Sequence, residues 1–182
     1  MEEIKQVPYG VSDFVTVRER NLYYVDKTMY LSLLEQQPDN LFYIRPRRFG
    51  KSLFISMLQA YYDKAMTDRF DSLFGGLWVH EHPTSLRGRY QMLYCSLMLD
   101  DFMHTYRDDY PEETVKAFFE TRQMADKLDL IRNSAVRLRI PLYLIIDEYD
   151  NFTNIVLNEK GEEVYHAITH ASGFYRDVFK KF

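Results

Sequence analysis

A chain of 182 residues with 46% hydrophobic and 27% charged residues fits one globular domain and excludes a disordered or membrane-spanning chain. Its net charge of −4 provides no overall basic field of the kind that indicates a nucleic-acid binder. No apolar stretch reaches the ~18 residues of a membrane span, the N-terminus lacks the layout of a signal peptide, and the single cysteine, Cys95, excludes an internal disulfide, so we expect a cytoplasmic protein.

The first forty residues predict a lead-in to the core rather than a part of it. They open with a segment rich in turn formers, and Leu22–Val25 predicts a short strand. Asp26 or Thr28 can cap a helix that ends near Gln36. We therefore expect one domain over residues 1–182, with a lead-in over 1–40 and a nucleotide-binding core, incomplete at its end, over 41–182.

From residue 41 onward, apolar runs rich in β-formers alternate with amphipathic segments. The expected strands are residues 41–44, 90–98 and 142–146, and the expected helices are residues 52–64, 100–139 and the last twenty. Alternation of this kind predicts an α/β fold in which helices flank a parallel sheet.

A glycine, a lysine and a serine stand in a row between the first expected strand and the next helix, at Gly50, Lys51 and Ser52. At such a junction backbone N–H groups and the positive end of the helix dipole face an anion. Gly50 allows the backbone to approach closely, Lys51 can reach the β- and γ-phosphates of a nucleotide, and the Ser52 hydroxyl can bind Mg²⁺. The usual pattern opens with glycine where this chain has Arg45, so a basic loop that only caps a helix is the alternative. The candidate nucleotide-binding residues are Arg47, Arg48, Phe49, Gly50, Lys51, Ser52 and Leu53.

Two acidic residues, Asp147 and Glu148, follow the most apolar strand of the chain. A phosphate-loop NTPase needs an acid at the end of a neighbouring strand to hold Mg²⁺, which predicts that Asp147 joins Ser52 as a metal ligand. An adjacent glutamate can polarise the attacking water, which makes Glu148 the candidate general base. A strand that merely ends in solvated acids is the alternative for this segment alone. Together with Lys51, the pair predicts a phosphate-loop NTPase that uses Mg²⁺.

Three blocks of the chain resemble the bacterial AAA-ATPase-like family: Tyr23–Thr28, Arg45–Leu53 and Leu144–Asp150. The opening Pro8–Phe14 is similar to the family's beginning. The resemblance implies that the arginine-led loop is the family's own form, and it implies a bacterial host, ATP binding and ATP hydrolysis. Many members continue into a restriction-endonuclease-like domain, so such a domain is an expected partner in the full-length protein.

The same resemblance implies that one strand of the sheet lies beyond Phe182, because AAA-type ATPases carry a further sensor strand after this last helix. A sheet without its middle strand leaves backbone groups unpaired. We therefore expect the sheet to be incomplete at its C-terminal end and the sequence to be the N-terminal portion of a longer ATPase.

Three functions fit the sequence. The first is an ATPase in which Lys51 and Glu148 are catalytic, Ser52 and Asp147 hold Mg²⁺, and ATP is the substrate. The second is a nucleotide-dependent switch without hydrolysis in a bacterial defence or signalling protein. The third is an interaction module whose loop is only a basic patch. The sequence does not predict the oligomeric state.

Weaker signals concern histidines and acids outside these blocks. His166 and His170 have metal-ligand spacing without a third ligand, and His80 and His82 fit a solvated loop better than a metal site. Asp100-Asp101 follow the second expected strand, where helix capping competes with a place at the edge of the site. Asp26, in the resembling block Tyr23–Thr28, caps a helix or borders the nucleotide.

Overall fold

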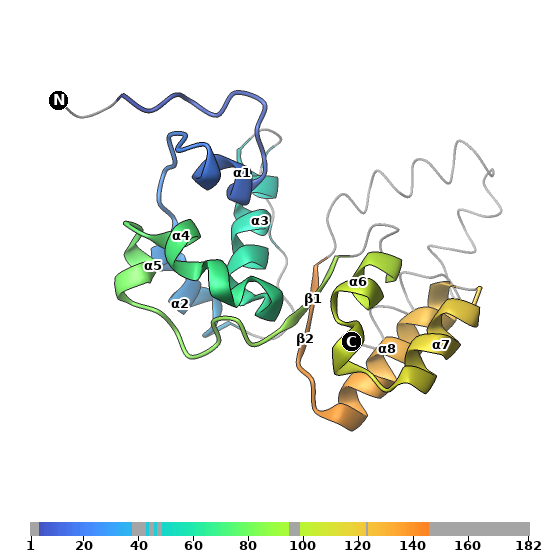
Figure 1. The fold of residues 1–182 in the computed structure, drawn as a ribbon. Coiled ribbons are helices and arrows are strands. Elements are labelled where there is room, and N and C mark those ends of the chain that lie inside the picture. Colours follow the sequence, from blue (N-terminus) through green and yellow to red (C-terminus); the bar gives the residue numbers. More distant parts are fainter. Residues whose placement is uncertain are drawn as a thin grey trace. The chain divides into compact units, whose positions relative to one another are not determined.

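The computed structural model describes residues 4–37, 43, 46, 49–94, 99–122 and 124–145 (Figure 1). The chain divides into two compact units, Met1–Met92 and Leu93–Phe182. This division falls inside a strand and does not coincide with the expected end of the lead-in near residue 40. The single domain over residues 1–182 stays a prediction.

The first unit consists of short helices arranged around one longer helix, α3. Its elements are α1 (Phe14–Glu19), η1 (Thr28–Tyr30), α2 (Leu31–Leu34), α3 (Lys51–Tyr62), η2 (Lys64–Arg69), α4 (Phe70–Phe74) and α5 (Trp78–Glu81). Helix α3 confirms the helix expected over residues 52–64. Its apolar residues recur at helical spacing, so that Met57, Leu58 and Tyr61 are buried on one face.

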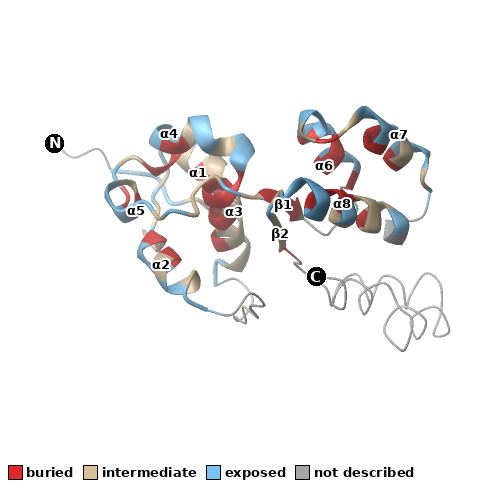
Figure 2. Cartoon of the chain, turned by 90° about the horizontal axis from the view of Figure 1, so that it is seen from below, coloured by how far each residue is buried: buried red, intermediate tan, exposed pale blue. Residues whose placement is uncertain are grey.

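Aromatic side chains join three of these helices into one core. The ring of Phe14 in α1 lies 5.0 Å from that of Phe74 in α4, and the ring of Tyr61 in α3 lies 5.5 Å from the same Phe74. All three side chains are almost completely buried, and Figure 2 shows the buried faces of these helices in red. The core therefore fixes α3 against α1 and α4.

The lead-in differs from its prediction in two places. Residues 22–25 are extended but form no strand, because the Tyr23 N–H bonds to the Gln6 carbonyl at 2.8 Å without a ladder around it. The helix expected up to Gln36 splits into η1 and α2 and ends at Leu34. The Asp26 carboxylate accepts the Thr28 N–H at 2.8 Å, so the segment begins as a local turn rather than as a regular helix.

The second unit carries the alternation that the sequence predicts. Its elements are β1 (Gln91–Tyr94), which begins in the last two residues of the first unit, α6 (Leu99–Thr105), η3 (Arg107–Asp109), α7 (Glu112–Glu120), α8 (Met124–Leu138) and β2 (Leu142–Ile145). β1 and β2 pair as neighbours in a two-stranded parallel sheet. The described residues thus confirm an α/β chain with parallel strands. The strand expected over residues 41–44 and the last expected helix lie outside them, except for Tyr43.

An apolar cluster holds the helices of the second unit together and packs against both strands. Its buried members are Leu93, Leu99, Phe102, Met103, Tyr106, Tyr110, Val115, Phe118, Leu128 and Ile131, with Leu142 and Leu144 packed against them. Pro111 stands at the N-cap of α7, where its missing N–H costs no hydrogen bond. Two glutamates follow in the first turn of α7, where the helix dipole favours negative charge.

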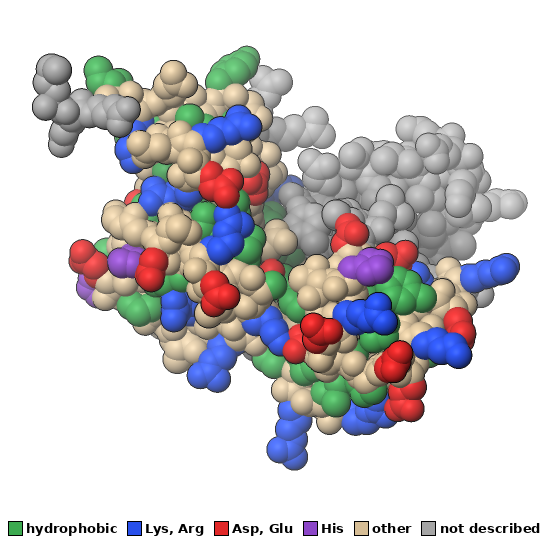
Figure 3. Space-filling model, viewed as in Figure 1, with side chains coloured by type: hydrophobic (Ala, Val, Ile, Leu, Met, Phe, Trp, Pro, Cys, Tyr) green, Lys and Arg blue, Asp and Glu red, His purple; other side chains and the backbone are tan. Residues whose placement is uncertain are grey.

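The surface of the described residues is mixed in charge. Figure 3 shows acidic and basic side chains interspersed on the visible face of each unit, with no large area of one sign. Among the helices of the described part of the chain, none is long and apolar enough to cross a membrane.

Candidate nucleotide-binding site

The candidate site is the start of helix α3, where the expected phosphate loop ends. Gly50 is the N-cap residue and has φ 73° and ψ 26°, a left-handed conformation. A Cβ at this position would meet no atom within 4 Å, so the backbone conformation, not space, is what favours glycine. The chain therefore turns sharply at Gly50 and enters the helix at Lys51.

The N-cap residue of α3 supplies no side-chain cap to the backbone donors of the first turn. Gly50 makes no capping hydrogen bond and the first turn contains no acidic residue. The first intrahelical bond runs from the Phe54 N–H to the Gly50 carbonyl, at 3.0 Å. The N–H groups of Lys51, Ser52 and Leu53 precede that bond in the chain, so no carbonyl within the helix accepts from them. This arrangement, with the positive end of the helix dipole, suits an anion.

The side chains around this helix end are accessible. Lys51, Ser52 and Leu53 are half-buried, and Phe49 is 63% exposed. The Phe49 N–H bonds to the Pro46 carbonyl at 3.3 Å, which makes a turn just before the helix. A lysine and a serine, both partly accessible, therefore stand in the first turn of the helix.

Helix α3 also packs against the segment that precedes the loop. The buried ring of Phe54 stacks on the ring of Tyr43, with centroids 5.0 Å apart and planes 24° apart. Tyr43 belongs to the expected strand over residues 41–44. The stacking thus holds the two ends of the expected phosphate loop beside each other.

The structure brings together five of the predicted site residues and leaves four outside its described part. Phe49, Gly50, Lys51, Ser52 and Leu53 lie together at the start of α3. The predicted residues outside the described part of the chain are Arg47, Arg48, Asp147 and Glu148. The approach of Asp147 to Lys51 stays a prediction.

Asp100 has a packing role in the second unit. Its Oδ1 lies 2.6 Å from the Nζ of Lys127, and that ammonium also lies 4.6 Å from the centre of the Phe118 ring. Asp100 and Asp101 stand in the first turn of α6, where carboxylates are favoured by the helix dipole. The ion pair ties α6 to α8, and capping of α6 by the Asp100 side chain stays a prediction.

The resembling block at Tyr23–Thr28 caps a distant helix. The Asp26 Oδ2 accepts the Trp78 N–H at 2.7 Å, and the Thr28 hydroxyl accepts the Val79 N–H at 3.1 Å. Helix α5 has no capping side chain at its own N-cap residue, Leu77. Asp26 and Thr28 therefore act as its cap from fifty residues away, a partnership for which the sequence offers no periodic signal.

The two histidines of the first unit, His80 and His82, stack on aromatic rings. His80 stacks on Phe70 with centroids 5.5 Å apart, and His82 stacks on Trp78 at 4.4 Å. Among the described residues, no three His, Cys, Asp or Glu side chains form a group that could hold a metal ion. His166 and His170 lie outside the described residues.

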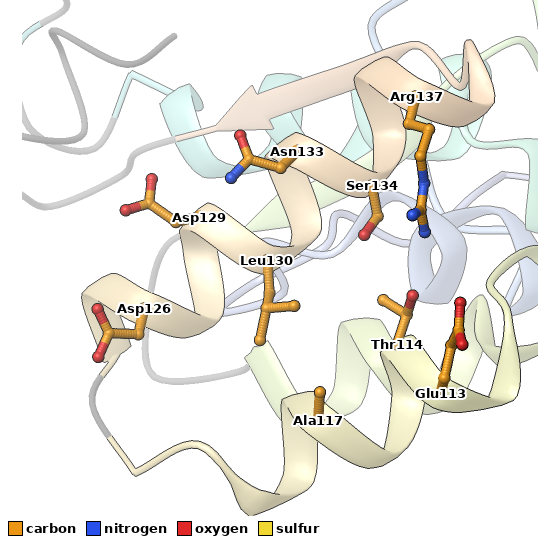
Figure 4. Close-up of a pocket in the computed structure, with 9 residues that line it drawn as sticks. All are labelled: Glu113, Thr114, Ala117, Asp126, Asp129, Leu130, Asn133, Ser134 and Arg137. Atoms are coloured by element: carbon orange, nitrogen blue, oxygen red, sulfur yellow. The ribbon is translucent and has the colours of Figure 1, made fainter.

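A groove of about 520 Å³ lies between α7 and α8 in the second unit. Its lining residues are Glu113, Thr114, Ala117, Asp126, Asp129, Leu130, Asn133, Ser134 and Arg137. Figure 4 shows Arg137 extending from α8 toward Thr114 and Glu113 of α7, while Asp126 lies at the opposite end. The groove has three carboxylates and one arginine, a charge balance that disfavours the binding of a polyphosphate. The start of α3 is therefore the better candidate for a nucleotide's phosphates.

The parallel α/β pairing and the start of α3, where a left-handed glycine precedes a lysine, define an α/β protein with a candidate anion site. The chain belongs to the AAA-ATPase-like family, whose description is predicted AAA-ATPase and whose model matches residues 8–182.

A relative from Azotobacter chroococcum mcd 1 is described as an uncharacterized protein in the vnfD 5' region. It is 41% identical over 78 residues, which are 42% of this chain and 14% of that protein. The chain thus matches a small part of that relative's length. No solved structure matches the chain.

Proposed function

We propose that the protein binds ATP at the start of α3 and hydrolyses it with the help of Mg²⁺. The observation that carries the proposal is the N-terminus of α3, where a left-handed Gly50 leads directly into Lys51 and Ser52. Backbone N–H groups and a lysine at one helix end are the donors that a nucleotide's phosphates require. Membership in a family described as predicted AAA-ATPase supports the same assignment.

In this proposal each side chain has one role. Lys51 neutralises charge on the β- and γ-phosphates, and Arg47 and Arg48 add guanidinium contacts to phosphate oxygens. The N–H groups from Gly50 to Leu53 bind the phosphates along the turn, and Phe49 lies beside them. Ser52 and Asp147 hold Mg²⁺, and Glu148 orients the water that attacks the γ-phosphate.

The residues assigned to the metal fit its chemistry. A hydroxyl and a carboxylate are oxygen ligands, which Mg²⁺ prefers, and Mg²⁺ usually keeps several waters and binds substrate phosphates as well. The half-buried Ser52 stands in the first turn of α3, beside the backbone donors assigned to the phosphates. The bound ion would offset the negative charge that develops on the phosphate oxygens.

The binding step is tested by titrating ATP·Mg against the parent protein, Lys51→Ala and Lys64→Ala. Lys64 is an exposed lysine just beyond the other end of α3, so its variant removes an equal charge away from the site. We expect Lys51→Ala to weaken binding about tenfold or more, because a charge-assisted phosphate contact is lost, and Lys64→Ala to bind like the parent. Equal affinity of Lys51→Ala and the parent would sink the assignment and leave an interaction module with a basic loop.

The hydrolytic step is tested by phosphate release from the parent and from Glu148→Gln. Removal of a general base lowers turnover by about 10²- to 10⁴-fold, while ATP binding should persist. Unchanged turnover in Glu148→Gln would contradict its role as the base. ATP binding without phosphate release by the parent would instead identify a nucleotide-dependent switch.

A further inference from the structure

A single serine of α3, Ser56, is joined to the beginning of α1. Its hydroxyl donates to the Asp13 Oδ2 at 2.8 Å and accepts the Phe14 N–H at 2.9 Å. Asp13 and Phe14 stand 43 and 42 residues before Ser56 in the chain. The Ser56 hydroxyl therefore donates one hydrogen bond to the start of α1 and accepts another from it.

The position of Ser56 relates it to the candidate site. Ser56 follows Ser52 by four residues, which in an α-helix means about 6 Å along the axis on nearly the same face. The link to α1 thus lies one turn behind Ser52, on the face that carries the proposed metal ligand. A rotation or slide of α3 at Ser56 would move Ser52 with it, because the helix is rigid over one turn.

The capping role of Asp13 does not account for this link. Capping uses the other carboxylate oxygen, since Oδ1 accepts the Thr16 N–H at 2.7 Å and the Thr16 hydroxyl at 2.6 Å. Oδ2 and the Phe14 N–H both go to Ser56. Asp13 therefore performs two separate tasks, one within α1 and one between α1 and α3.

Helix α1 is also fixed within the first unit by contacts with α4. Phe14 and Val17 are completely buried. The guanidinium of Arg18 donates through Nε to the Leu73 carbonyl and through an Nη to the Gly75 carbonyl, each at 2.6 Å. These carbonyls end helix α4, so α1 is a fixed base against which Ser56 can hold α3.

We propose that Asp13 and Ser56 are positioning residues that set the rotation of α3 about its axis, and thereby direct Ser52 and Lys51 toward Mg²⁺ and the phosphates. The inference rests on the proposed function of the α3 start. Groups that bind and react need to be held within about 0.5 Å of the productive position. A short helix face packed only through apolar side chains is less strictly oriented than one with a two-bond polar link.

The test compares three variants of the whole protein: Ser56→Ala, which removes the link, Ser56→Thr, which keeps a hydroxyl, and Thr16→Val. Thr16→Val removes the side-chain bond to Asp13 within α1 and leaves Ser56 untouched, so it is the control for mere loss of stability. For each variant, ATP affinity is measured with Mg²⁺ and in EDTA, well below its unfolding midpoint. The ratio of the two affinities reports the contribution of the metal.

We expect Ser56→Ala to lower ATP affinity in Mg²⁺ about fivefold, the effect of losing one ordinary hydrogen bond, and to reduce the affinity ratio between Mg²⁺ and EDTA. Ser56→Thr should restore both values, and Thr16→Val should leave both as in the parent. The inference would be overturned if the ratio of ATP affinities in Mg²⁺ and EDTA were the same in Ser56→Ala as in the parent. It would also be overturned if Thr16→Val, at the same loss of stability, lost as much ATP affinity as Ser56→Ala.

The outcomes separate this inference from the proposed function. If the parent binds ATP in a manner that depends on Lys51 while Ser56→Ala binds equally well, only the positioning role fails. If Lys51→Ala binds like the parent, the proposed function fails and the positioning role fails with it.

Discussion

The two units of the molecule differ in the contacts that stabilise each of them internally. In the first unit α1, α4 and α5 have six, five and four residues, and polar side chains from distant segments bind their ends. In the second unit α7 and α8 have nine and fifteen residues, and a cluster of apolar side chains joins them to the strands.

This difference follows from helix length. A helix of one or two turns forms too few backbone bonds to offset the cost of starting it, so its exposed N–H and carbonyl groups need partners from elsewhere. Longer amphipathic helices obtain most of their stability from the burial of one face. The first unit should therefore depend on individual polar contacts in addition to its aromatic core, and the second mainly on individual core side chains.

The largest effect is expected from a core truncation in the second unit. Phe118→Ala removes a ring that is completely buried and should lower the free energy of unfolding by about 3–5 kcal/mol, because it removes apolar burial and leaves a cavity. The control is the neighbouring Phe119→Ala, since Phe119 is 41% exposed, with an expected loss below about 1 kcal/mol. Urea denaturation measures both, and equal losses would contradict the role of the apolar cluster.

A smaller effect is expected from the cap that joins two parts of the first unit. Asp26→Ala leaves the Trp78 and Thr28 N–H groups without their partner and should lower the free energy of unfolding by about 1–2 kcal/mol. Asp68→Ala is the control, because Asp68 is exposed, and it should change the free energy of unfolding little. If Asp26→Ala instead weakened ATP binding at unchanged stability, Asp26 would border the nucleotide and the comparison of the two units would lose one of its supports.

The smallest effect concerns pH. Partial burial raises the pKa of the Asp13 carboxyl, but hydrogen bonds from the Thr16 hydroxyl, the Thr16 N–H, the Ser56 hydroxyl and the Val15 N–H outweigh it, so the pKa lies below its ordinary value of 3.8. A lowered folded-state pKa means that Asp13 contributes stability above that ordinary value and loses the contribution as pH falls through the folded-state pKa.

The parent should accordingly exceed Asp13→Asn in the free energy of unfolding at neutral pH, by less than about 1 kcal/mol because the carboxyl is exposed. The difference should shrink below about pH 4. Denaturation curves at neutral and acidic pH measure this, with Asp68→Asn as the control. A difference that stayed constant down to the lowest accessible pH would mean that the Asp13 hydrogen bonds do not depend on its charge.

Prediction from the sequence succeeded where local pattern and packing agree. Helix α3 and the described parts of the strands expected over residues 90–98 and 142–146 are confirmed, as are the helices within residues 100–139. It was wrong at Leu22–Val25, where β-forming residues meet no partner strand. The helix expected up to Gln36 is present as the adjoining η1 and α2 and ends at Leu34, two residues early.

The candidate site was predictable in part for the same reason. Gly50, Lys51 and Ser52 form a local signal, and the structure places them at the start of α3, as expected. Their role in nucleotide binding stays a prediction, and so do the roles of Arg47, Arg48, Asp147 and Glu148. The link from Asp13 to Ser56 was missed, because neither residue is unusual in its own segment.

The sequence by itself determined the helix start at Gly50-Lys51, the parallel α/β alternation and the family resemblance, since each depends on residues close together in the chain. Only the tertiary structure decided which partners Asp13, Arg18 and Asp26 bind, across 43 to 57 residues of chain. The physical reason is that a polar side chain forms a hydrogen bond with any suitable donor or acceptor within reach. Which groups come within reach depends on how the short helices pack, and no periodicity in the sequence records that.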